Sequence, residues 1–299
     1  MQSFPLGPFS VGRIGFGAMQ LPGPGVFGPP RDHDEAIAVL RRAVELGVDH
    51  IDTAQFYGPE VANELIREAL APYPDDLALV SKVGARRDDS GAWLPAHQPD
   101  ELRQGIEDNL RTLGADRLAA VNLRVMDPEA DPNQPGRVHA ELFDKQLTAM
   151  IRARDDGLIA GIGLSNITLE HLRIALGRTD IVCVQNAFNL IDRTSRPVLE
   201  ECAARGIAFV PFFPLGSGFA ADNPVLGNPV VRRTAERLGR TPAQVALAWT
   251  LAYSPPGCPA GNVLLIPGTS SVRHLEENMA VADIELGAET IDELTAQAA

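Results

Sequence analysis

Residues 47–70 read GVDHIDTAQFYGPEVANELIREAL and contain the unit from which the fold is predicted. A short apolar run, GVDHIDT, leads into the polar loop of residues 52–58, and a helical pattern follows. In this pattern Val61, Leu65 and Ala69 share one stripe, as in a helix that packs one face on a core. Short apolar runs bounded by polar or glycine residues are typical of parallel strands buried on both faces. We therefore interpret the stretch as one strand–loop–helix unit.

The same unit recurs along the chain. Seven further apolar runs have this character: RIGFGAM (13–19), LALVSK (77–82), LAAVNLR (118–124), IAGIGLS (159–165), IVCVQN (181–186), IAFVPFF (207–213) and NVLLIPG (262–268). Helical patterns lie between most of them, including residues 33–47, 60–70 and 99–114. Alternating strands and helices also occur in open doubly wound sheets, but eight strands favour an α/β fold of the (β/α)8 TIM barrel type.

No linker or change in composition divides the chain, so one barrel domain is predicted over residues 1–299. Residues 1–13 are expected to form a hairpin at the bottom of this barrel. The irregular stretches 20–31, 84–98 and 212–229 are expected to shape a pocket, because long loops without a function are uncommon.

Composition excludes several classes of protein. The formal net charge of −13 opposes binding to nucleic acid or anionic lipid. Cys183, Cys202 and Cys258 have no metal-binding spacing, and the six histidines show no paired ligand pattern, so no metal is expected. The sequence shows no apolar run of about 18 residues and no signal peptide, so we expect a cytoplasmic protein that spans no membrane. The sequence leaves the oligomeric state open.

Polar residues stand where several predicted strands end. They are Asp52, Lys82, Arg124, Ser165, Asn166 and Gln185. Active sites of (β/α)8 barrels lie at the carboxyl ends of the strands, and Asp, Lys and Arg are seldom buried unless paired. A series of such residues at successive strand ends therefore predicts an active site there.

Asp52, Tyr57 and Lys82 together suit the reduction of a carbonyl group. The carbonyl oxygen must gain a proton as hydride reaches the carbon, and a phenol with an ordinary pKa of about 10 is a poor donor near neutral pH. A lysine ammonium beside a phenol favours the phenolate and lowers that pKa. Asp52 would hold Lys82 in place and keep it charged. The alternative is a buried Asp–Lys pair beside an ordinary loop tyrosine.

The sequence resembles the aldo-keto reductase superfamily along nearly its whole length. The motifs that carry the resemblance occur in family order and spacing: GFGAMQL (15–21), DTAQFYGPEVANELI (52–66), LVSKVG (79–84), GLSN (163–166), VQNAFN (184–189), PFFPLG (211–216) and IPGTSSVRHLEEN (266–278). It resembles in particular a bacterial, pyridoxal reductase-like subgroup with Asn-Leu-Arg at the end of the fourth strand. The resemblance implies an NADPH-dependent oxidoreductase that reduces a small aldehyde or ketone to an alcohol.

The family's catalytic tetrad of Asp, Tyr, Lys and His implies that Asp52, Tyr57 and Lys82 are catalytic, with Tyr57 as proton donor. In the place of the histidine this chain has Arg124, within VNLRVMD. Arginine stays protonated and offers several donors, so it can polarise a carbonyl oxygen and attract an anionic substrate group. It cannot act as an acid–base residue near neutral pH. Alternatively, Arg124 forms a salt bridge with a neighbouring acid.

The resemblance also implies a set of cofactor-binding residues. They are Gly17, Ala18, Met19, Asp52, Ser165, Asn166, Gln185, Phe212, Phe213, Pro214, Leu215, Ser217, Gly218, Ile266, Gly268, Thr269, Ser270, His274, Glu277 and Asn278. Among them Phe212 takes the place of the aromatic residue that stacks on the nicotinamide. Gly268, Thr269 and Ser270 open a helix whose N-terminus suits a phosphate, Glu277 and Asn278 match adenine contacts, and NADPH is preferred over NADH. Phe56 and Trp93 are candidate apolar walls of the substrate pocket.

Other interpretations have less support. Gly23, Gly25 and Gly28 match the pattern GxGxxG, but prolines interrupt it and no helix follows, which argues against a Rossmann dehydrogenase. An aldolase that forms a Schiff base on Lys82 remains open, although the cofactor motifs argue against it. A regulatory protein that binds NADPH with little turnover also remains open, because the usual histidine is absent.

Overall fold

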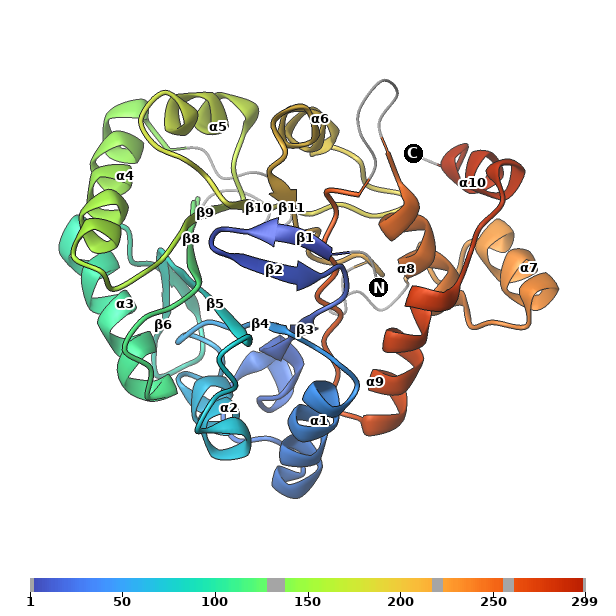
Figure 1. The fold of residues 1–299 in the computed structure, drawn as a ribbon, viewed down its shortest axis with the longest axis horizontal. Helices are drawn as coiled ribbons and strands as arrows, with labels where there is room; N and C mark the ends of the chain where they lie inside the picture. The colour runs from blue at the N-terminus through green and yellow to red at the C-terminus, as the bar shows by residue number, and fades with distance from the viewer. Residues whose placement is uncertain (1–2, 128–137, 217–222, 255–260, 298–299) are drawn as a thin grey trace.

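The structure is a computed structural model, and it describes residues 3–127, 138–216, 223–254 and 261–297. At its centre lies a curled sheet of seven parallel strands in the order β11-β10-β9-β8-β5-β4-β3 (Figure 1). The strands are β3 (Phe16–Gly17), β4 (His50–Asp52), β5 (Ala78–Val83), β8 (Ala120–Arg124), β9 (Ile162–Ser165), β10 (Cys183–Gln185) and β11 (Ala208–Phe209). Seven of the eight predicted strands are therefore found at their predicted places.

The eighth predicted strand, in residues 262–268, is not a regular strand. It makes isolated parallel bridges instead, one from Val263 to Phe209 of β11 and one from Leu265 to Ile14. Two backbone hydrogen bonds accompany each bridge, of 2.8 and 2.9 Å at the first and of 2.8 Å each at the second. This segment therefore contacts the chain at both edges of the sheet.

Helices follow the strands and surround the sheet (Figure 1). The first six are α1 (His33–Glu45), α2 (Val61–Leu70), α3 (Pro99–Leu113), α4 (Ala140–Asp155), α5 (Leu169–Leu176) and α6 (Arg196–Arg205). The Asp32 side chain caps α1, and α3 begins with Pro99 and ends at Gly114, whose φ is +65°. The three helices predicted by range end within two residues of their predicted bounds.

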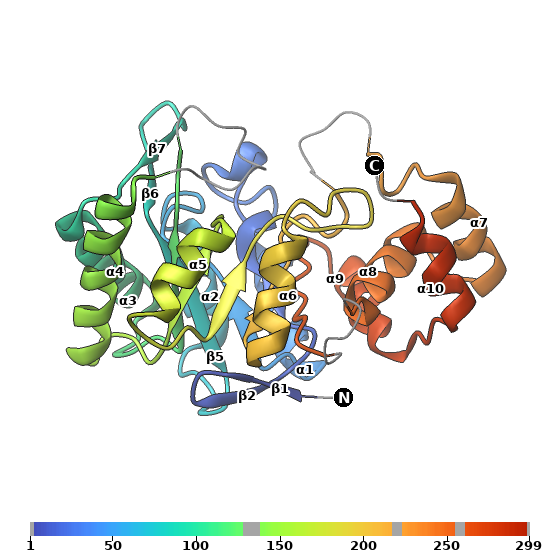
Figure 2. The ribbon, with the colours of Figure 1, turned by 90° about the horizontal axis from the view of Figure 1, so that it is seen from above.

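Four more helices complete the chain. They are α7 (Pro229–Leu238), α8 (Pro242–Ala252), α9 (Val272–Met279) and α10 (Ala288–Thr295). Figure 2 shows them gathered at one side of the molecule, and α9 lies against α1. In the part of the chain that the structure describes, no helix has the length and apolar character needed to cross a membrane.

Residues 3–12 form an antiparallel hairpin of β1 (Ser3–Leu6) and β2 (Phe9–Gly12). Its Leu6 and Val11 pack in one cluster with Ala78, Ala120 and Ala208, which are the first residues of three strands. The hairpin therefore covers the amino ends of the strands, and Figure 2 shows it at the bottom of the sheet.

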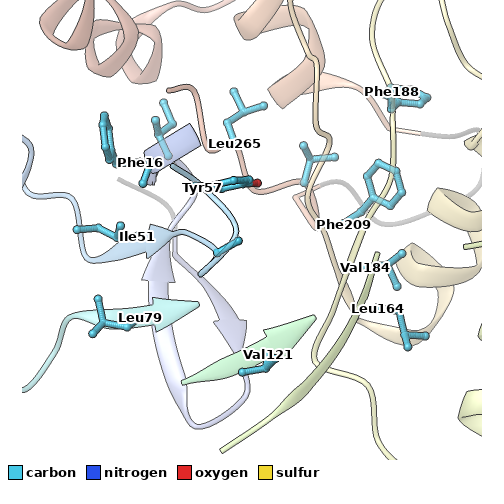
Figure 3. Packing of buried hydrophobic residues seen from close by; sticks show 14 of the residues in the cluster. Phe16, Ile51, Tyr57, Leu79, Val121, Leu164, Val184, Phe188, Phe209 and Leu265 are labelled. Atoms are coloured by element: carbon cyan, nitrogen blue, oxygen red, sulfur yellow. The ribbon is translucent and has the colours of Figure 1, made fainter. Parts of the chain in front are cut away.

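Alternate residues of the strands pack in two different cores. Leu79 belongs to the larger cluster with Ile51 and Val121, and Figure 3 shows such residues following one another from strand to strand. Its chain neighbours Ala78 and Val80 belong to the smaller cluster that the hairpin covers. Both faces of each strand are apolar, which explains the continuous apolar runs in the sequence.

The segment 84–98 is more regular than the predicted loop. It contains the antiparallel hairpin of β6 (Ala85–Arg87) and β7 (Trp93–Pro95). The stretch 20–31 contains the short 3-10 turn η2 (Pro24–Val26), as suits a loop rather than a Rossmann helix.

Candidate active site

An ion pair is buried where β4 and β5 end. The Lys82 ammonium donates to Oδ1 of Asp52 and, at 3.1 Å, to the backbone carbonyl of Thr53. Gln185, at the end of β10, donates to the other carboxylate oxygen at 2.6 Å. Asp52 is 3% exposed and Lys82 is 5% exposed. The two charges are therefore balanced by each other and by these hydrogen bonds rather than by water.

Tyr57 lies directly beside this pair. The Nζ of Lys82 is 5.1 Å from the centroid of the tyrosine ring, and Figure 3 shows the hydroxyl pointing into the space between the strands. Burial lowers the pKa of Lys82, but the charges and hydrogen bonds of Asp52 and Tyr57 outweigh burial, so the pKa lies above its ordinary value of 10.5. Lys82 therefore stays protonated next to the phenol.

A buried polar network holds the strand ends that carry the ion pair. The Thr53 hydroxyl donates to Oδ1 of Asn63 at 2.8 Å, and the Ser81 hydroxyl donates to Oδ1 of Asn109 at 2.6 Å. Asn63 of α2 also donates to Asn109 of α3 at 2.9 Å. The sequence analysis did not identify these residues. Because Thr53 and Ser81 each adjoin a member of the ion pair, the network fixes the positions of both charges.

Arg124 ends β8 close to the same centre. Its Nη1 lies 3.5 Å from Oγ of Ser165, and its Cζ lies 5.6 Å from the centroid of the Phe212 ring. Burial lowers the pKa of Arg124, and Tyr57 opposes this shift. The neighbours Ser165 and Phe212 are both uncharged, so the guanidinium contacts a hydroxyl group and an aromatic ring.

The residues expected at the nicotinamide lie next to this centre. Asn166 has a left-handed backbone (φ +59°), and its amide group donates to the Val125 carbonyl at 3.0 Å. The Gln185 side-chain oxygen is buried and finds no hydrogen-bond partner among the described residues. An unpaired buried acceptor is costly, so this oxygen suits a ligand that donates an N–H group.

Two glycines let distant backbone segments meet at the edge of this site. A Cβ atom on Gly17 would lie 2.5 Å from the Ile266 carbonyl, and one on Gly268 would meet the Gly17 carbonyl. Ala18 and Met19 follow directly in the 3-10 turn η1 (Ala18–Gln20), although they were predicted at the end of a strand. The five cofactor residues predicted here therefore lie together.

Another group of predicted cofactor residues follows β11, later in the chain than Arg124. Those that the structure describes are Phe212, Phe213, Pro214 and Leu215. Phe212 forms a parallel bridge with Ala187, and Phe213 has a left-handed backbone (φ +55°). Ser217 and Gly218, which were also predicted, lie outside the described residues.

The remaining predicted cofactor residues lie just before α9 (Val272–Met279) and along it. Thr269 and Ser270 precede this helix, and His274, Glu277 and Asn278 lie within it. The predicted cofactor residues thus form one group at the strand ends around the ion pair and another in and before α9, and Gly17 approaches Ile266 and Gly268 of the second group.

The predicted pocket residues Phe56 and Trp93 contact each other. Their ring centroids are 5.5 Å apart, and Phe56 meets Tyr57 edge to face at 5.3 Å. Phe56 is buried, whereas Trp93 on β7 is 38% exposed. Phe56 therefore packs behind the tyrosine, and Trp93 is the aromatic surface that remains accessible.

Arg87 on β6 holds this wall together and was missed by the sequence analysis. Its guanidinium lies between the rings of Trp93, at 4.3 Å, and Phe27, at 5.2 Å. It also donates to three backbone carbonyls, those of Gly25, Val26 and Gly91. Residues 26–28 in turn exchange backbone hydrogen bonds with Gly58, next to Tyr57. Arg87 therefore connects the β6–β7 hairpin to the loop that borders the tyrosine.

Comparisons with known proteins identify the family and similar folds. The model of the Aldo/keto reductase family matches residues 13–299. The chain is 50% identical over 292 residues to pyridoxine 4-dehydrogenase of Escherichia coli (strain K12), covering 98% of this chain and 96% of that protein. The structure of aldo-keto reductase Tm1743 with the inhibitor epalrestat aligns with a TM-score of 0.79 at 28% identity, over 99% of this chain and 100% of the other. An aldo-keto reductase from Klebsiella pneumoniae in complex with NADPH aligns with a TM-score of 0.78 at 24% identity, over 99% and 94%.

Replacing Asp52 with Asn will expose the cost of an unpaired buried ammonium. We expect Asp52→Asn to lower the free energy of unfolding by about 3–5 kcal/mol at neutral pH. Without the carboxylate, burial places the pKa of Lys82 below its unfolded value, so stability should recover as pH rises toward 10.5. Urea unfolding across this pH range measures both effects.

The double variant Asp52→Asn/Lys82→Met is the control, because it removes both charges and should be more stable than Asp52→Asn alone. If the single variant unfolds like the wild type at every pH, the ion pair does not have the role assigned to it.

Replacing Arg87 with Met will loosen the loop beside Tyr57. We expect backbone amides in residues 23–31 and 53–60 to exchange with deuterium roughly tenfold faster in Arg87→Met, because charged hydrogen bonds to the loop are lost. Hydrogen exchange with mass spectrometry measures this, and Arg86→Met, at the exposed neighbouring position, is the control. Equal exchange in the two variants would contradict the connection.

Proposed function

This chain belongs to the aldo/keto reductase family, and on that premise we propose that it is an NADPH-dependent reductase of a small aldehyde with Tyr57 as proton donor. The observation that carries the proposal is the buried Asp52–Lys82 pair beside the tyrosine ring. We further propose that residues 263–265 act as the eighth strand of a (β/α)8 barrel formed by one domain, since they bridge both edges of the sheet.

The proposed substrate is pyridoxal, with pyridoxine as the alcohol product. The E. coli relative is named pyridoxine 4-dehydrogenase, and oxidation of the alcohol at that position gives the aldehyde of pyridoxal. Trp93 is partly exposed although Arg87 lies over its ring, and its exposed aromatic surface suits a flat heteroaromatic ring. The Arg124 guanidinium suits the phenolic oxygen next to this aldehyde, because it remains charged and offers several donors.

NADPH is the proposed cofactor, and it supplies the hydride when bound. The Klebsiella relative of the same fold was solved in complex with NADPH. In this chain the unpaired oxygen of Gln185 can accept from the carboxamide of a nicotinamide. The close backbone approach of Gly17 and Gly268 leaves no room for side chains at the cofactor's border. These residues therefore fit the group that the family resemblance implies.

The chain's own residues control the proton. The Tyr57 hydroxyl gives its proton to the carbonyl oxygen as the carbonyl carbon receives hydride, so that aldehyde, NADPH and one proton give alcohol and NADP⁺. The ammonium of Lys82 stabilises the phenolate that this transfer leaves, and Asp52 keeps the ammonium charged. Arg124 donates to the carbonyl oxygen and takes the place of the family's histidine.

The ion pair argues against the Schiff-base alternative. An amine must be neutral to attack a carbonyl, whereas the charges and hydrogen bonds of Asp52 and Tyr57 outweigh burial and keep Lys82 protonated. A regulatory protein that binds NADPH would not need this pair to face a tyrosine hydroxyl. Turnover distinguishes the regulatory alternative from the proposed enzyme.

The test is oxidation of NADPH in the presence of pyridoxal, measured with the wild type and Tyr57→Phe. We expect the wild type to turn over and Tyr57→Phe to lose roughly 100- to 10,000-fold in kcat, while still binding NADPH. Tyr73→Phe is the control, because the Tyr73 hydroxyl donates to the Leu113 carbonyl instead. NADPH binding without oxidation across a broad panel of aldehydes would contradict the proposal and favour a regulatory role.

A further inference from the structure

Glu35 of α1 places a carboxylate at the beginning of α9. Its Oε1 accepts a hydrogen bond from the backbone N–H of Val272 at 2.9 Å, from 237 positions away in the sequence. The N-cap residue of α9, Ser271, makes no capping bond with its own side chain. The first turn of this helix therefore obtains its negative partner from another helix.

Residues expected to lie near a phosphate of the cofactor stand at the beginning of the same helix. Gly268, Thr269 and Ser270 precede the helix, and His274 lies in its first turn. The N–H groups of a helix N-terminus attract one anion, and a second negative charge at the same place is repelled by the first. A phosphate bound here would therefore meet the carboxylate that already occupies this helix end.

Nearby cationic side chains do not compensate this carboxylate. Arg273 pairs with Glu277 at 2.7 Å, and Arg42 pairs with two other glutamates. No basic side chain pairs with Glu35 among residues 3–127, 138–216, 223–254 and 261–297. The charge of Glu35 is thus balanced by the Val272 N–H and the helix dipole.

We propose that Glu35 sets the choice between the two nicotinamide cofactors by disfavouring the 2′-phosphate. The inference rests on the proposed function, since it requires the adenosine end of a dinucleotide at α9. The ribose 2′-hydroxyl of NADH can donate to the carboxylate. The 2′-phosphate of NADPH is repelled by it and competes for the same helix end. Glu35 therefore brings the affinity for NADPH closer to the affinity for NADH.

The test measures the binding of NADPH and of NADH to Glu35→Gln and to the wild type by calorimetry. Glutamine keeps an oxygen that accepts from Val272, so the cap is retained and only the charge is lost. We expect the ratio of NADPH affinity to NADH affinity to rise by roughly tenfold, and the rise to shrink at high salt. The ratio of the affinity for 2′,5′-ADP to the affinity for 5′-AMP should rise in the same way, because these two fragments differ only by the 2′-phosphate.

Asp34→Asn is the matched control, because it removes one charge from the adjacent, fully exposed side chain. It should leave the ratio unchanged. If Glu35→Gln binds both dinucleotides with an unchanged ratio, or weakens both equally, the role of Glu35 is wrong while the proposed function stands. If the wild type binds neither dinucleotide, the proposed function fails and this inference fails with it.

Discussion

Two opposite charges, on Asp52 and Lys82, are buried side by side where β4 and β5 end. Either charge alone would be expensive at this depth, so each depends on the other and on the hydrogen bond from Gln185. The surrounding structure fixes the positions of these three residues. Parallel strands bring the three residues to one end of the sheet, and the network through Asn63 and Asn109 fixes the backbone next to both charges. The consequence is an ammonium held beside a phenol.

Most of the sheet could be predicted from the sequence, because strands that are buried on both faces leave continuous apolar runs. The run at 262–268 shows where this signal ends. It has the same composition as the others, yet its residues form isolated bridges, and composition does not reveal how regular a hydrogen-bond ladder is. The β6–β7 hairpin was missed for a different reason. Its strands have only three residues each, too few to show a periodic pattern, and Arg87 joins it to residues about 60 positions earlier.

The centre of the site could be predicted because Asp52, Lys82, Arg124 and Gln185 lie at or next to the ends of strands, and Tyr57 follows Asp52 within one motif of the family. The supporting residues follow a weaker signal. Asn63 and Asn109 are polar residues on the buried faces of α2 and α3, which is a sign of a buried network that the sequence analysis passed over. Glu35 carries no local signal at all, since its contact with α9 exists only after the chain has folded.

Titration of Lys82 tests the account most directly. The chain has only two lysines, Lys82 and Lys145, so a protein labelled with carbon-13 lysine gives two side-chain signals by NMR. Lys145→Arg leaves one signal and assigns it to Lys82. The account predicts that this lysine keeps its proton through the neutral range, with a pKa above 10.5. Loss of the proton between about pH 6 and 9 would show that burial outweighs Asp52, and it would contradict the account.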